Sequence, residues 1–428
     1  MKIKLLALLL LPFTCLAQKG GIHFEEGLTW DQVKAKALTE HKYILVDCYT
    51  TWCGPCKFMK EQIFTLEDIG RTVDSNFISI TLQMDSTSSD DATIRQGYTQ
   101  ANLFARKYHI DVFPTFLFFA PDGTIVHKAT GASVDSKSFL RKAEEALDPD
   151  KQYYTLSEHY KEHAGDSLFL RKTIIAALAA SENQQAGTIT DLYIDCLKNP
   201  FLKENLQLIQ HSTRSVNSKG FRLFLQHQTE VDTSLGLNSA NQFLVDIITR
   251  EKINPLLAGN AALVDWNLLY KQLRAQYPLQ AEELVIRAKP AYYFSRKLFE
   301  LYGKALVEYM NRYGGDLPTA DLNDKAWYVF LYCKDPAVLR QALTWSRRTF
   351  TGNILAEDNP IDTYANLLYK AGDKKAAILW ESKAASMAHM RAVLTKVEKY
   401  LSLRDKYLKT IDRMEKGENI WDHPLELE

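Results

Sequence analysis

The 428-residue sequence has little cysteine and no net charge, and beyond its first residues it has no hydrophobic run of membrane-spanning length. Lysine plus arginine and aspartate plus glutamate both number 52. Proteins that bind nucleic acid carry a basic excess, so this balance gives no support for a nucleic-acid or anionic-membrane partner. We therefore expect no nucleic acid among the partners. We also expect no stable membrane insertion, which needs about 20 consecutive apolar residues.

The N-terminus carries a hydrophobic run next to basic residues. Two early lysines are followed by an unbroken apolar run from Leu5 to Leu11 and then by small residues. This is the pattern of a secretory signal, and Ala17 fits the last position before cleavage. We expect residues 1–17 to be a signal peptide, and the mature chain to be exported, soluble, and periplasmic or otherwise extracytoplasmic. Lipidation at Cys15 is the alternative, although the preceding "PFT" lacks the usual leucine and small residues.

Five of the six cysteines remain after that cleavage. A disulfide framework needs more cysteines than this, and an even number of them. Cys53 and Cys56 are separated only by Gly54 and Pro55. No second CxxC and no paired-histidine motif supplies the further ligands that zinc would need, so we expect no metal and no cofactor. The pair indicates redox chemistry, with a structural disulfide as the alternative. The other cysteines are expected in the core: Cys48, Cys196 and Cys333.

Residues 22–148 alternate between strand-like and helix-like patterns. Strands are expected at 43–49 and 78–85, and as a pair within 115–131 that turns at Pro121-Asp122-Gly123. Helices are expected at 28–42, starting at Thr29 or Asp31, and at 54–77, 99–110 and 136–147. The polar stretch 86–101 indicates a surface loop. Mixed βα units followed by a hairpin predict a central mixed sheet flanked by helices.

Residues 151–428 show amphipathic helical patterns in succession, and no strand-like pattern interrupts them. Asp148-Pro149-Asp150 marks the boundary before them. The "ALTW" at 342–345 recurs as "AILW" at 377–380, and residues 367–384 resemble a tetratricopeptide unit with Gly372 at its turn. Two approximate copies do not make a regular array. We therefore expect an all-α bundle or an irregular, partly tetratricopeptide-like solenoid.

The spacing of the cysteine pair suits thiol–disulfide exchange. After a strand, "WCGPC" places Cys53 at a helix N-terminus, where free backbone N–H groups and the helix dipole favour the thiolate. Pro55 is tolerated in the first helical turn. Cys56, one turn on, is in position to attack a mixed disulfide formed by Cys53. The pattern predicts Cys53 as the attacking thiol and Cys56 as the resolving thiol.

With these motifs the sequence resembles the thioredoxin family over residues 22–148. "ILVDCYTTWCGPCK" is similar to the strand and active site of that family, and "YHIDVFPTFLFFAPDG" to its cis-proline strand. The resemblance implies an α/β thioredoxin fold, followed here by an all-α domain, and a redox-active disulfide between Cys53 and Cys56. It also implies that Asp47 is a buried carboxylate that moves the proton of the resolving thiol. A carboxylate in an apolar strand costs free energy unless it has such a task.

The same resemblance predicts which residues contact a substrate. Pro114 is expected to follow a cis peptide bond and to lie against the cysteines, with the backbone of Phe113 pairing with a bound substrate strand. Gly131 is expected to line the substrate groove, and Trp52 to flank the reactive thiol. The expected substrate-contacting set is Trp52, Gly54, Pro55, Phe113, Pro114 and Gly131.

Three features depart from the family. Thr81 stands where many thioredoxins have a lysine that pairs with the buried aspartate, which leaves the pKa of Asp47 open. Phe113 replaces a smaller or β-branched residue before the proline, so substrate preference is open as well. The polar stretch 86–101 is longer than the usual connection. His109, near the cis-proline strand, is expected at the surface.

Together these observations predict an exported thiol–disulfide oxidoreductase. Gly-Pro between the cysteines is typical of reducing members of the family, so a reductant is expected. In an oxidising compartment it would need a membrane electron donor, a thiol reductase, in addition to cysteine-containing protein clients. The alternative is an interaction or client-holding protein, in which the helical domain binds partners and the thioredoxin domain mainly recognises cysteine-containing clients.

Overall fold

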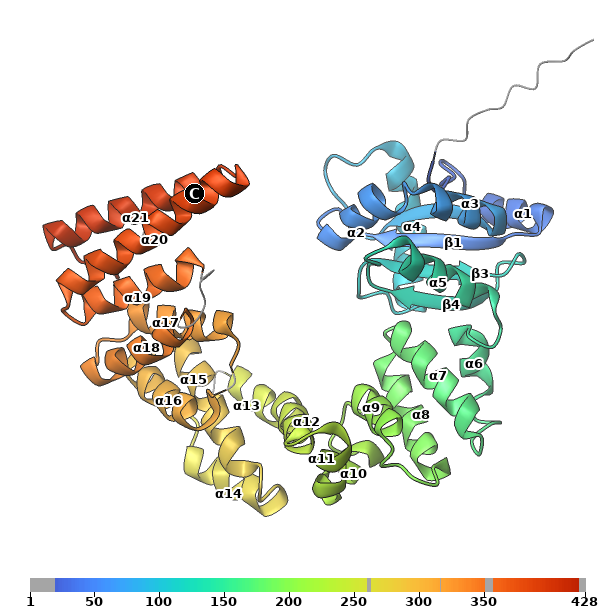
Figure 1. Cartoon of the computed structure of the whole chain (residues 1–428). Coiled ribbons are helices and arrows are strands. Elements are labelled where there is room, and N and C mark those ends of the chain that lie inside the picture. The colour runs from blue at the N-terminus through green and yellow to red at the C-terminus, as the bar shows by residue number, and fades with distance from the viewer. Residues whose placement is uncertain (1–19, 260–262, 316, 351–356, 423–428) are drawn as a thin grey trace, which may run out of the picture. The chain divides into compact units, whose positions relative to one another are not determined.

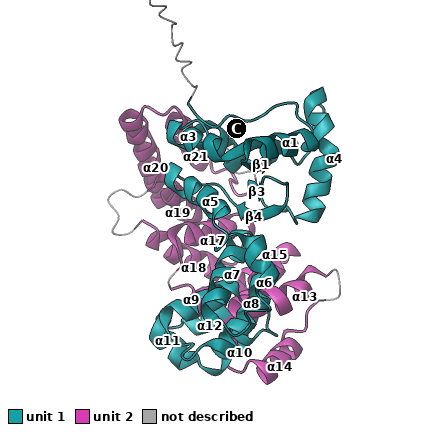
Figure 2. Cartoon of the chain, turned by 90° about the vertical axis from the view of Figure 1, so that its right-hand side faces the viewer, with its two compact units in different colours: residues 1–243 teal, residues 244–428 magenta. Residues whose placement is uncertain are grey.

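The computed structural model describes residues 20–259, 263–315, 317–350 and 357–422. The chain forms two compact units, Met1–Phe243 and Leu244–Glu428 (Figure 2). The predicted signal peptide, residues 1–17, and Cys15 lie outside the described residues. The domain boundaries expected around 148–151 stay predictions, because the units are defined by compactness and not by the change to helical structure.

The first unit begins with a four-stranded mixed sheet (Figure 1). Its strands are β1 (Tyr43–Tyr49), β2 (Phe77–Gln83), β3 (Thr115–Phe119) and β4 (Ile125–Thr130). They lie in the order β2-β1-β3-β4, with β1 parallel to β2 and antiparallel to β3. β3 and β4 form an antiparallel hairpin. The mixed sheet predicted from the sequence is confirmed.

Helices cover both faces of this sheet (Figure 1). One face packs against α1 (Trp30–Glu40) and α4 (Ala92–Lys107). The other face packs against η1 (Met59–Ile63), a π-helical turn that continues α2 (Gly54–Phe58), and against α3 (Glu67–Asn76) and α5 (Ser136–Leu147). Side chains of a strand alternate between faces, so Val46 and Cys48 face α1 and α4, and Leu45 faces the other side. Cys48 is fully buried, as predicted.

Helix ends and turns follow from local sequence at several places. Thr29 caps α1: its hydroxyl accepts the Gln32 amide at 3.3 Å, and the Gln32 side chain accepts the Thr29 amide at 2.8 Å. In the β3–β4 hairpin, the Gly123 amide donates to the Ala120 carbonyl at 2.8 Å, and Gly123 adopts a φ of +84°. Glycine accepts this left-handed conformation without steric cost. The predicted turn is confirmed.

The single helix expected over 54–77 is wrong, because the helix is interrupted. η1 ends at Ile63 and α3 begins only at Glu67. A continuous helix would bond the Phe64 carbonyl to the amide four residues on, but this carbonyl accepts the Ile22 amide at 2.8 Å. The N-terminal segment therefore competes successfully for the carbonyl and ends the helix.

The surface loop expected over 86–101 is wrong for most of its length. α4 begins at Ala92, where the Asp91 side chain accepts the Ile94 amide at 2.9 Å. The helix expected at 99–110 therefore begins earlier, and it ends at Lys107. Only residues 84–91 connect β2 to α4. The buried residues of α4 are only Ala101 and Phe104, which explains why its sequence is polar enough to suggest a loop.

After α5 the described residues contain helices and no strand, as predicted. In the first unit these helices are α6 (Tyr153–His159), α7 (Ser167–Ala179), α8 (Asn183–Cys196), α9 (Lys203–Ser212), α10 (Lys219–Gln226) and α11 (Gln228–Leu235). α12 (Ser239–Ile248) crosses the border between the units. Cys196, expected in the core, is only half-buried, and its Sγ donates to the Ala164 carbonyl at 3.0 Å.

The helical part of the first unit covers the outer edge of β4. The Tyr153 amide donates to Nδ1 of His127 at 3.1 Å, and the hydroxyls of Thr130 and Ser181 lie 2.7 Å apart. His127 is buried, and burial lowers its pKa to about 4, so the ring is neutral and able to accept this bond. An uncovered edge strand invites pairing with other chains, and these helices remove that risk.

A buried ion pair joins β4 to the turn before α8. The Lys128 side chain is 2% exposed, and its ammonium donates to the Glu182 carboxylate at 2.8 Å. It also donates to the carbonyls of Tyr108 at 2.9 Å and His109 at 3.0 Å. His109 itself is mostly exposed, as predicted. Three acceptors compensate the desolvation of the Lys128 charge, and one of them comes from the helical part.

The second unit is helical throughout its described residues. Its elements after α12 are η2 (Thr249–Ile253), α13 (Asn254–Ala258), α14 (Trp266–Gln276), α15 (Ala281–Ser295), α16 (Phe299–Tyr313), α17 (Thr319–Tyr332), α18 (Pro336–Arg348), α19 (Asp358–Lys370), α20 (Lys374–Thr395) and α21 (Lys399–Lys416). Gly372 forms the expected turn between α19 and α20 with a φ of +96°. Ala377 and Ala384 are fully buried, and Cys333 is buried as predicted. A regular tetratricopeptide repeat stays a prediction.

We predict that Glu182→Ala destabilises the first unit, because the substitution leaves the buried Lys128 ammonium with backbone acceptors only. The free energy of unfolding should fall by about 2–4 kcal/mol in urea denaturation followed by circular dichroism. Glu158→Ala, which removes an exposed carboxylate from neighbouring α6, should change it by less than about 0.5 kcal/mol. Equal effects of the two substitutions would contradict a role for the ion pair.

Candidate active site

The cysteine pair lies at the start of α2, after β1 and a short turn. Cys53 and Cys56 form a disulfide with an Sγ–Sγ distance of 2.05 Å, and the intervening Gly54 and Pro55 are exposed. Cys53 is the N-cap of α2, and its Sγ accepts the Cys56 amide at 3.0 Å. An amide donor at a helix start stabilises negative charge on sulfur. The geometry therefore favours Cys53 as the thiolate once the disulfide is reduced.

Aromatic side chains border the disulfide. Cys53 is 3% exposed, whereas the adjacent Trp52 is 70% exposed. The Trp52 indole meets the Phe113 ring edge-on, with a centroid distance of 5.9 Å and an interplanar angle of 90°. A reaction partner approaching Cys53 therefore meets an apolar surface that includes these two rings.

The loop before β3 provides a second wall of the site. The Phe113–Pro114 peptide bond is cis, as predicted. The Pro114 carbonyl accepts the Gly131 amide at 2.8 Å, which ties this loop to the segment after β4. The structure thus brings Phe113, Pro114 and Gly131 together, while their contacts with a substrate stay predictions.

Lys142 supports this wall from α5 and was not identified from the sequence. Its ammonium donates to the carbonyls of Thr130, at 3.0 Å, and Gly131, and lies 5.3 Å from the centroid of the Phe116 ring. Burial lowers the pKa of Lys142 to about 8. The sequence offered no signal, because the acceptors are backbone carbonyls at the end of β4, which residue types do not identify.

Asp47 lies in the middle of the sheet, paired in register with Thr81 on β2 and Phe116 on β3. It is 6% exposed, and its Oδ1 has no hydrogen-bond partner among the described residues. Burial raises the pKa of Asp47 to about 7. Asp47 is therefore buried, as predicted, and able to exchange a proton near neutral pH. Its part in proton transfer stays a prediction.

Lys60 supplies the positive charge that Thr81 cannot supply. It lies in η1, the turn that follows the cysteines, and its charge opposes the rise in the pKa of Asp47. Thr81 on β2 is the register partner of Asp47 on β1, so the residue at position 81 lies next to the carboxylate in the sheet. The cation that opposes the effect of burial on Asp47 therefore lies in η1 and not in the sheet.

A second carboxylate, Asp85, holds the turn that leads to the cysteines. It accepts the Thr51 amide at 3.0 Å and the Thr51 hydroxyl at 2.5 Å. The connection that carries Asp85 is itself fixed by Asp90, which accepts the Thr87 amide at 2.8 Å and the Gln83 side-chain amide at 2.9 Å. Hydrogen bonds from Thr87 and Tyr98 hold the pKa of Asp90 below its usual range.

Asp90 was missed because its polar stretch suggested only a solvated loop, and Asp85 because it was taken as the last residue of a strand. One signal was available, since Asp85 ends a buried strand at the sheet edge where the cysteine turn was also expected. The sequence does not reveal the partner of Asp85, because Thr51 lies 34 positions away in the chain.

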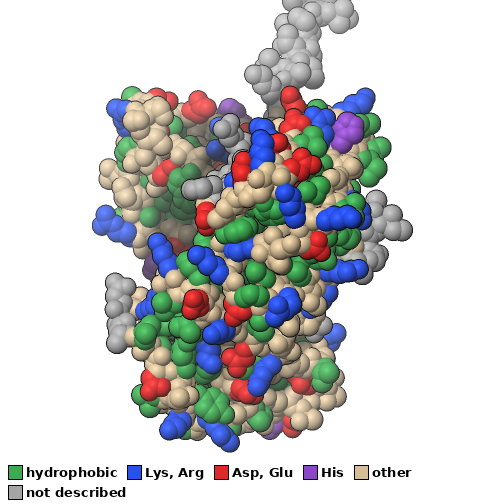
Figure 3. Space-filling view, turned by 90° about the vertical axis from the view of Figure 1, so that its left-hand side faces the viewer, with side chains coloured by type: hydrophobic (Ala, Val, Ile, Leu, Met, Phe, Trp, Pro, Cys, Tyr) green, Lys and Arg blue, Asp and Glu red, His purple; other side chains and the backbone are tan. Residues whose placement is uncertain are grey.

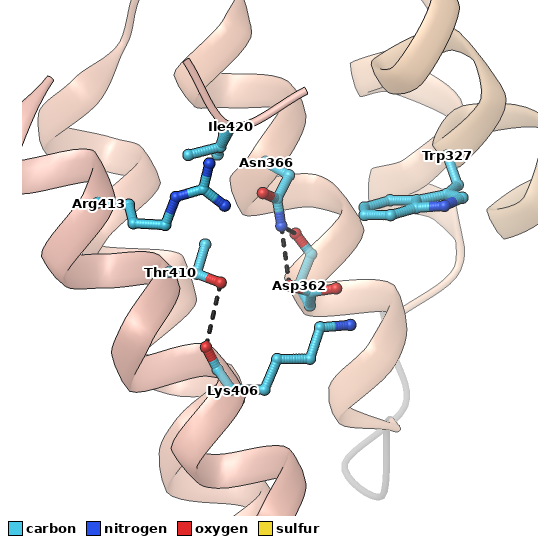
Figure 4. Close-up of a pocket in the computed structure, with 7 residues that line it drawn as sticks. All are labelled: Trp327, Asp362, Asn366, Lys406, Thr410, Arg413 and Ile420. Carbon is cyan, nitrogen blue, oxygen red and sulfur yellow. Dashed lines mark hydrogen bonds between the residues drawn. The ribbon is translucent and has the colours of Figure 1, made fainter. Parts of the chain in front are cut away.

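The second unit has its own polar cluster, shown in Figure 4. Asp362 and Asn366 of α19 face Lys406 of α21 across a cavity of about 10 Å³. Asp362 and the fully buried Glu381 have raised pKa values, in both cases mainly because of burial. The cavity has room for about one water molecule, so it does not accommodate a substrate.

Within residues 20–259, 263–315, 317–350 and 357–422, no three His, Cys, Asp or Glu side chains are grouped so that they could hold a metal ion. No helix in the described part of the chain has the length and apolar character needed to cross a bilayer.

The sheet, the disulfide at a helix start and the cis-proline loop define the fold of a thioredoxin-like disulfide oxidoreductase. Residues 30–147 match the model of the thioredoxin-like domain family, and they form a thioredoxin-like domain. The chain is 28% identical over 119 residues to thioredoxin Y1 of Arabidopsis thaliana, which is 28% of this chain and 58% of that protein. It is also 28% identical over 124 residues to thioredoxin H-type 2 of Nicotiana tabacum, covering 28% of this chain and 86% of that protein.

Solved structures match about a third of the chain. The oxidoreductase DsbH is 16% identical, with a TM-score of 0.26, and the match covers 33% of this chain and 94% of that chain. The chain spans little more than half the length of several curated relatives that it matches. Each of these three matches covers less than a third of this chain. Most of the helical part after residue 150 therefore lies outside them.

We predict that Asp47→Asn stabilises the oxidised protein above neutral pH. The pKa of Asp47 is about 7 in the folded protein and 3.8 without its environment. The folded state therefore binds the proton more tightly, and this carboxyl lowers stability progressively as the pH rises from about 4 to about 7. The variant lacks this effect, so its free energy of unfolding should exceed that of the wild type at pH 8 by at most about 4 kcal/mol.

Urea unfolding at pH 4 and pH 8 measures this difference, which should be much smaller at pH 4. Asp111→Asn, at an exposed aspartate of the same domain, serves as the control and should show no such pH dependence. A difference between wild type and Asp47→Asn that is equal at both pH values would contradict the raised pKa.

We predict that Lys60→Ala raises the pKa of Asp47 further, because it removes the positive charge that opposes the effect of burial. The expected rise is up to about one unit, measured as the titration midpoint of the Asp47 carboxyl carbon by NMR. Lys57→Ala removes an equal charge from the same helical run and should leave the midpoint nearly unchanged. The idea fails if both substitutions shift the midpoint equally.

Proposed function

We propose that the chain is an exported thiol–disulfide oxidoreductase that reduces disulfides of protein clients. The observation that carries the proposal is the Cys53–Cys56 disulfide at the start of α2, with the Cys56 amide directed at the Cys53 sulfur. The buried Asp47, with its pKa of about 7, supports it. A purely structural disulfide would need neither a helix start nor a buried carboxyl of this kind.

Reduction of a client proceeds in two exchanges. The Cys53 thiolate attacks one sulfur of the client disulfide, forms a mixed disulfide and releases the other client sulfur as a thiolate. The Cys56 thiol then loses its proton, and its thiolate attacks the Cys53 sulfur. The Cys53–Cys56 disulfide forms and the second client thiolate leaves. Two electrons pass to the client, and its two sulfurs become thiols by taking up two protons.

Asp47 serves the second exchange in this scheme. With a pKa of about 7 it is partly ionised at neutral pH, so it can accept the proton that Cys56 loses. Lys60 keeps the ionised form accessible by opposing the effect of burial. Asp85 acts differently: it fixes the turn at Thr51 and so positions the attacking cysteine.

The apolar surface at the site suits a protein client. Besides Trp52, Val112 is 40% exposed and Val134 is 82% exposed, and both lie in the loops that carry Pro114 and Gly131. An extended client segment could place apolar side chains there while its cysteine reaches Cys53. The bulk of Phe113, packed against Trp52, would favour small residues next to the client cysteine.

Reduction in an exported location requires an electron source. Each cycle leaves Cys53 and Cys56 oxidised, so a membrane thiol reductase must return two electrons to them. The Gly-Pro pair between the cysteines supports the reducing direction. A second candidate function is client holding, in which the helical part binds partners and the thioredoxin-like domain recognises cysteine-containing segments. The long helical part of the chain favours this candidate.

An assay of insulin reduction by dithiothreitol distinguishes catalysis of disulfide reduction from client holding. We expect wild-type protein to accelerate insulin precipitation and Cys53→Ser to abolish the acceleration. Cys56→Ser should instead accumulate a mixed disulfide through Cys53, visible on non-reducing gels. Cys196→Ser, at a half-buried cysteine outside the motif, should retain full activity. Equal turnover by wild type and Cys53→Ser would refute catalysis and leave client holding.

The reduction potential of the pair tests the direction of transfer. A value near the roughly −270 mV of thioredoxin supports a reductant, and one near about −120 mV indicates an oxidant. Equilibration with glutathione buffers, followed by alkylation of Cys53, measures it.

A further inference from the structure

The hairpin of α20 and α21 carries a group of exposed apolar side chains in the second unit. They lie around the turn between the two helices and are between 36% and 75% exposed. Few other stretches of the described chain expose apolar side chains so densely. We call this group the tip surface; its members are Met390, Val393, Leu394, Val397 and Leu401.

The tip surface spans the end of α20 and the start of α21. Met390, Val393 and Leu394 follow the spacing of one side of α20, Val397 lies in the turn and Leu401 in the first turn of α21. α20 ends at Thr395, and Lys396 closes it in a left-handed conformation with a φ of +57° before α21 begins at Lys399. The opposite side of α20 is already used, because Ala384, Ala385, Ala388 and Ala392 are buried. Folding of the hairpin therefore does not need the tip surface.

Buried polar contacts hold the hairpin rigidly against α19. The Asp358 carboxylate accepts from Arg391 of α20 at 2.7 Å and from the Tyr407 hydroxyl of α21 at 2.8 Å. Asp358 is 2% exposed, so both helices are fixed at an interior point. The tip surface is thus presented by a fixed element and not by a loose end.

Lysines without an ion pair lie at and near the tip surface. Lys396 and Lys399 stand at the turn, with Glu398 between them in the sequence, and Lys409 follows on α21. Arg391 and Arg404 are already paired, with Asp358 and Asp405. Among the described residues, no carboxylate lies within 4.0 Å of the ammonium groups of Lys396, Lys399 and Lys409, which leaves them open to an external anion. In the face shown by Figure 3, hydrophobic and Lys or Arg side chains occur next to one another.

We propose that the tip surface docks on an anionic lipid bilayer. Its apolar side chains would enter the boundary between headgroups and acyl chains, and the neighbouring lysines would meet anionic headgroups. A symmetric contact with a second copy would place the same lysines against each other, which disfavours that occupant. The contact is peripheral and reversible, because no helix in the described part of the hairpin is long and apolar enough to cross a bilayer. It is independent of the redox proposal, since it uses no residue of the cysteine site.

Vesicle flotation with the full mature chain tests this docking. We expect co-flotation with vesicles of 70% phosphatidylcholine and 30% phosphatidylglycerol and little with pure phosphatidylcholine, and binding should weaken as salt rises from low to high. Val393→Ser with Leu394→Ser should reduce the bound fraction at least tenfold, and so should Lys396→Glu with Lys399→Glu.

Two control variants carry single substitutions of the same kinds in the first unit. Leu237→Ser removes an exposed leucine of the first unit, and Lys203→Glu reverses an exposed lysine there; both should float like the wild type. Circular dichroism and thermal melting check that each variant is folded, and insulin reduction should be unchanged in all of them.

The proposal is overturned if wild-type protein ignores anionic vesicles, or if tip and control variants bind equally. It is also overturned if analytical ultracentrifugation shows a dimer that the tip substitutions dissociate, because a second copy would then occupy the surface. Loss of insulin reduction in the wild type would instead refute the redox function and leave the docking result standing.

Discussion

The burial of Asp47 is the constraint on which the redox site depends. The carboxyl sits in a strand whose other side chains are mostly apolar, between two neighbouring strands, and one of its oxygens has no partner among the described residues. Such a group destabilises the folded protein whenever it is ionised. The sheet tolerates it because both faces are covered by well-packed helices, whose cores supply more than enough stabilisation. The same packing fixes the position of α2 above the sheet.

The thioredoxin-like domain and the first helices after it are joined by side-chain contacts as well as by the chain itself. Glu182, from the helical part, supplies the carboxylate that pairs with the buried Lys128 on β4. His127 and Thr130 on the same strand also bond to that part. Gly131, whose amide bonds to the Pro114 carbonyl, follows Thr130 directly, and Lys142 donates to the carbonyls of both. The helices therefore reach the site through β4, and they stabilise one of its walls without contributing a reacting group.

Sequence patterns predicted the geometry of the cysteine pair well, because it depends on local structure. The cysteines, the turn between them and their place at a helix start all lie within a few residues, so their geometry follows from backbone rules. Asp47 stood out because a charged residue interrupted an apolar strand. The cis-proline loop was predictable only through the likeness to a family, since no local rule brings Pro114 to Gly131.

The failures share one physical cause, which is that side-chain and backbone partners cannot be identified from the residue types alone. The helix over 54–77 was broken by Ile22, a residue more than thirty positions away, which captured a backbone carbonyl. The stretch 86–101 was taken for a loop because α4 buries little, although Asp90 and Asp91 organise it. Lys60, Asp85 and Lys142 carry ordinary charges on polar segments. What distinguishes them is the group each one faces, and composition does not contain that information.

The net charge of the whole chain also does not show how charge is distributed over its surface. Balanced totals of basic and acidic residues argued against an anionic partner, yet the balance is a sum over two compact units. Electrostatic attraction falls off over roughly 10 Å in physiological salt, so a surface responds to the charges near it and not to the total. At the turn between α20 and α21, Lys396 and Lys399, which have no ion pair among the described residues, lie near exposed leucine and valine, while most of the acidic residues that balance the count lie elsewhere in the chain. Recognition by such a surface is therefore compatible with zero net charge.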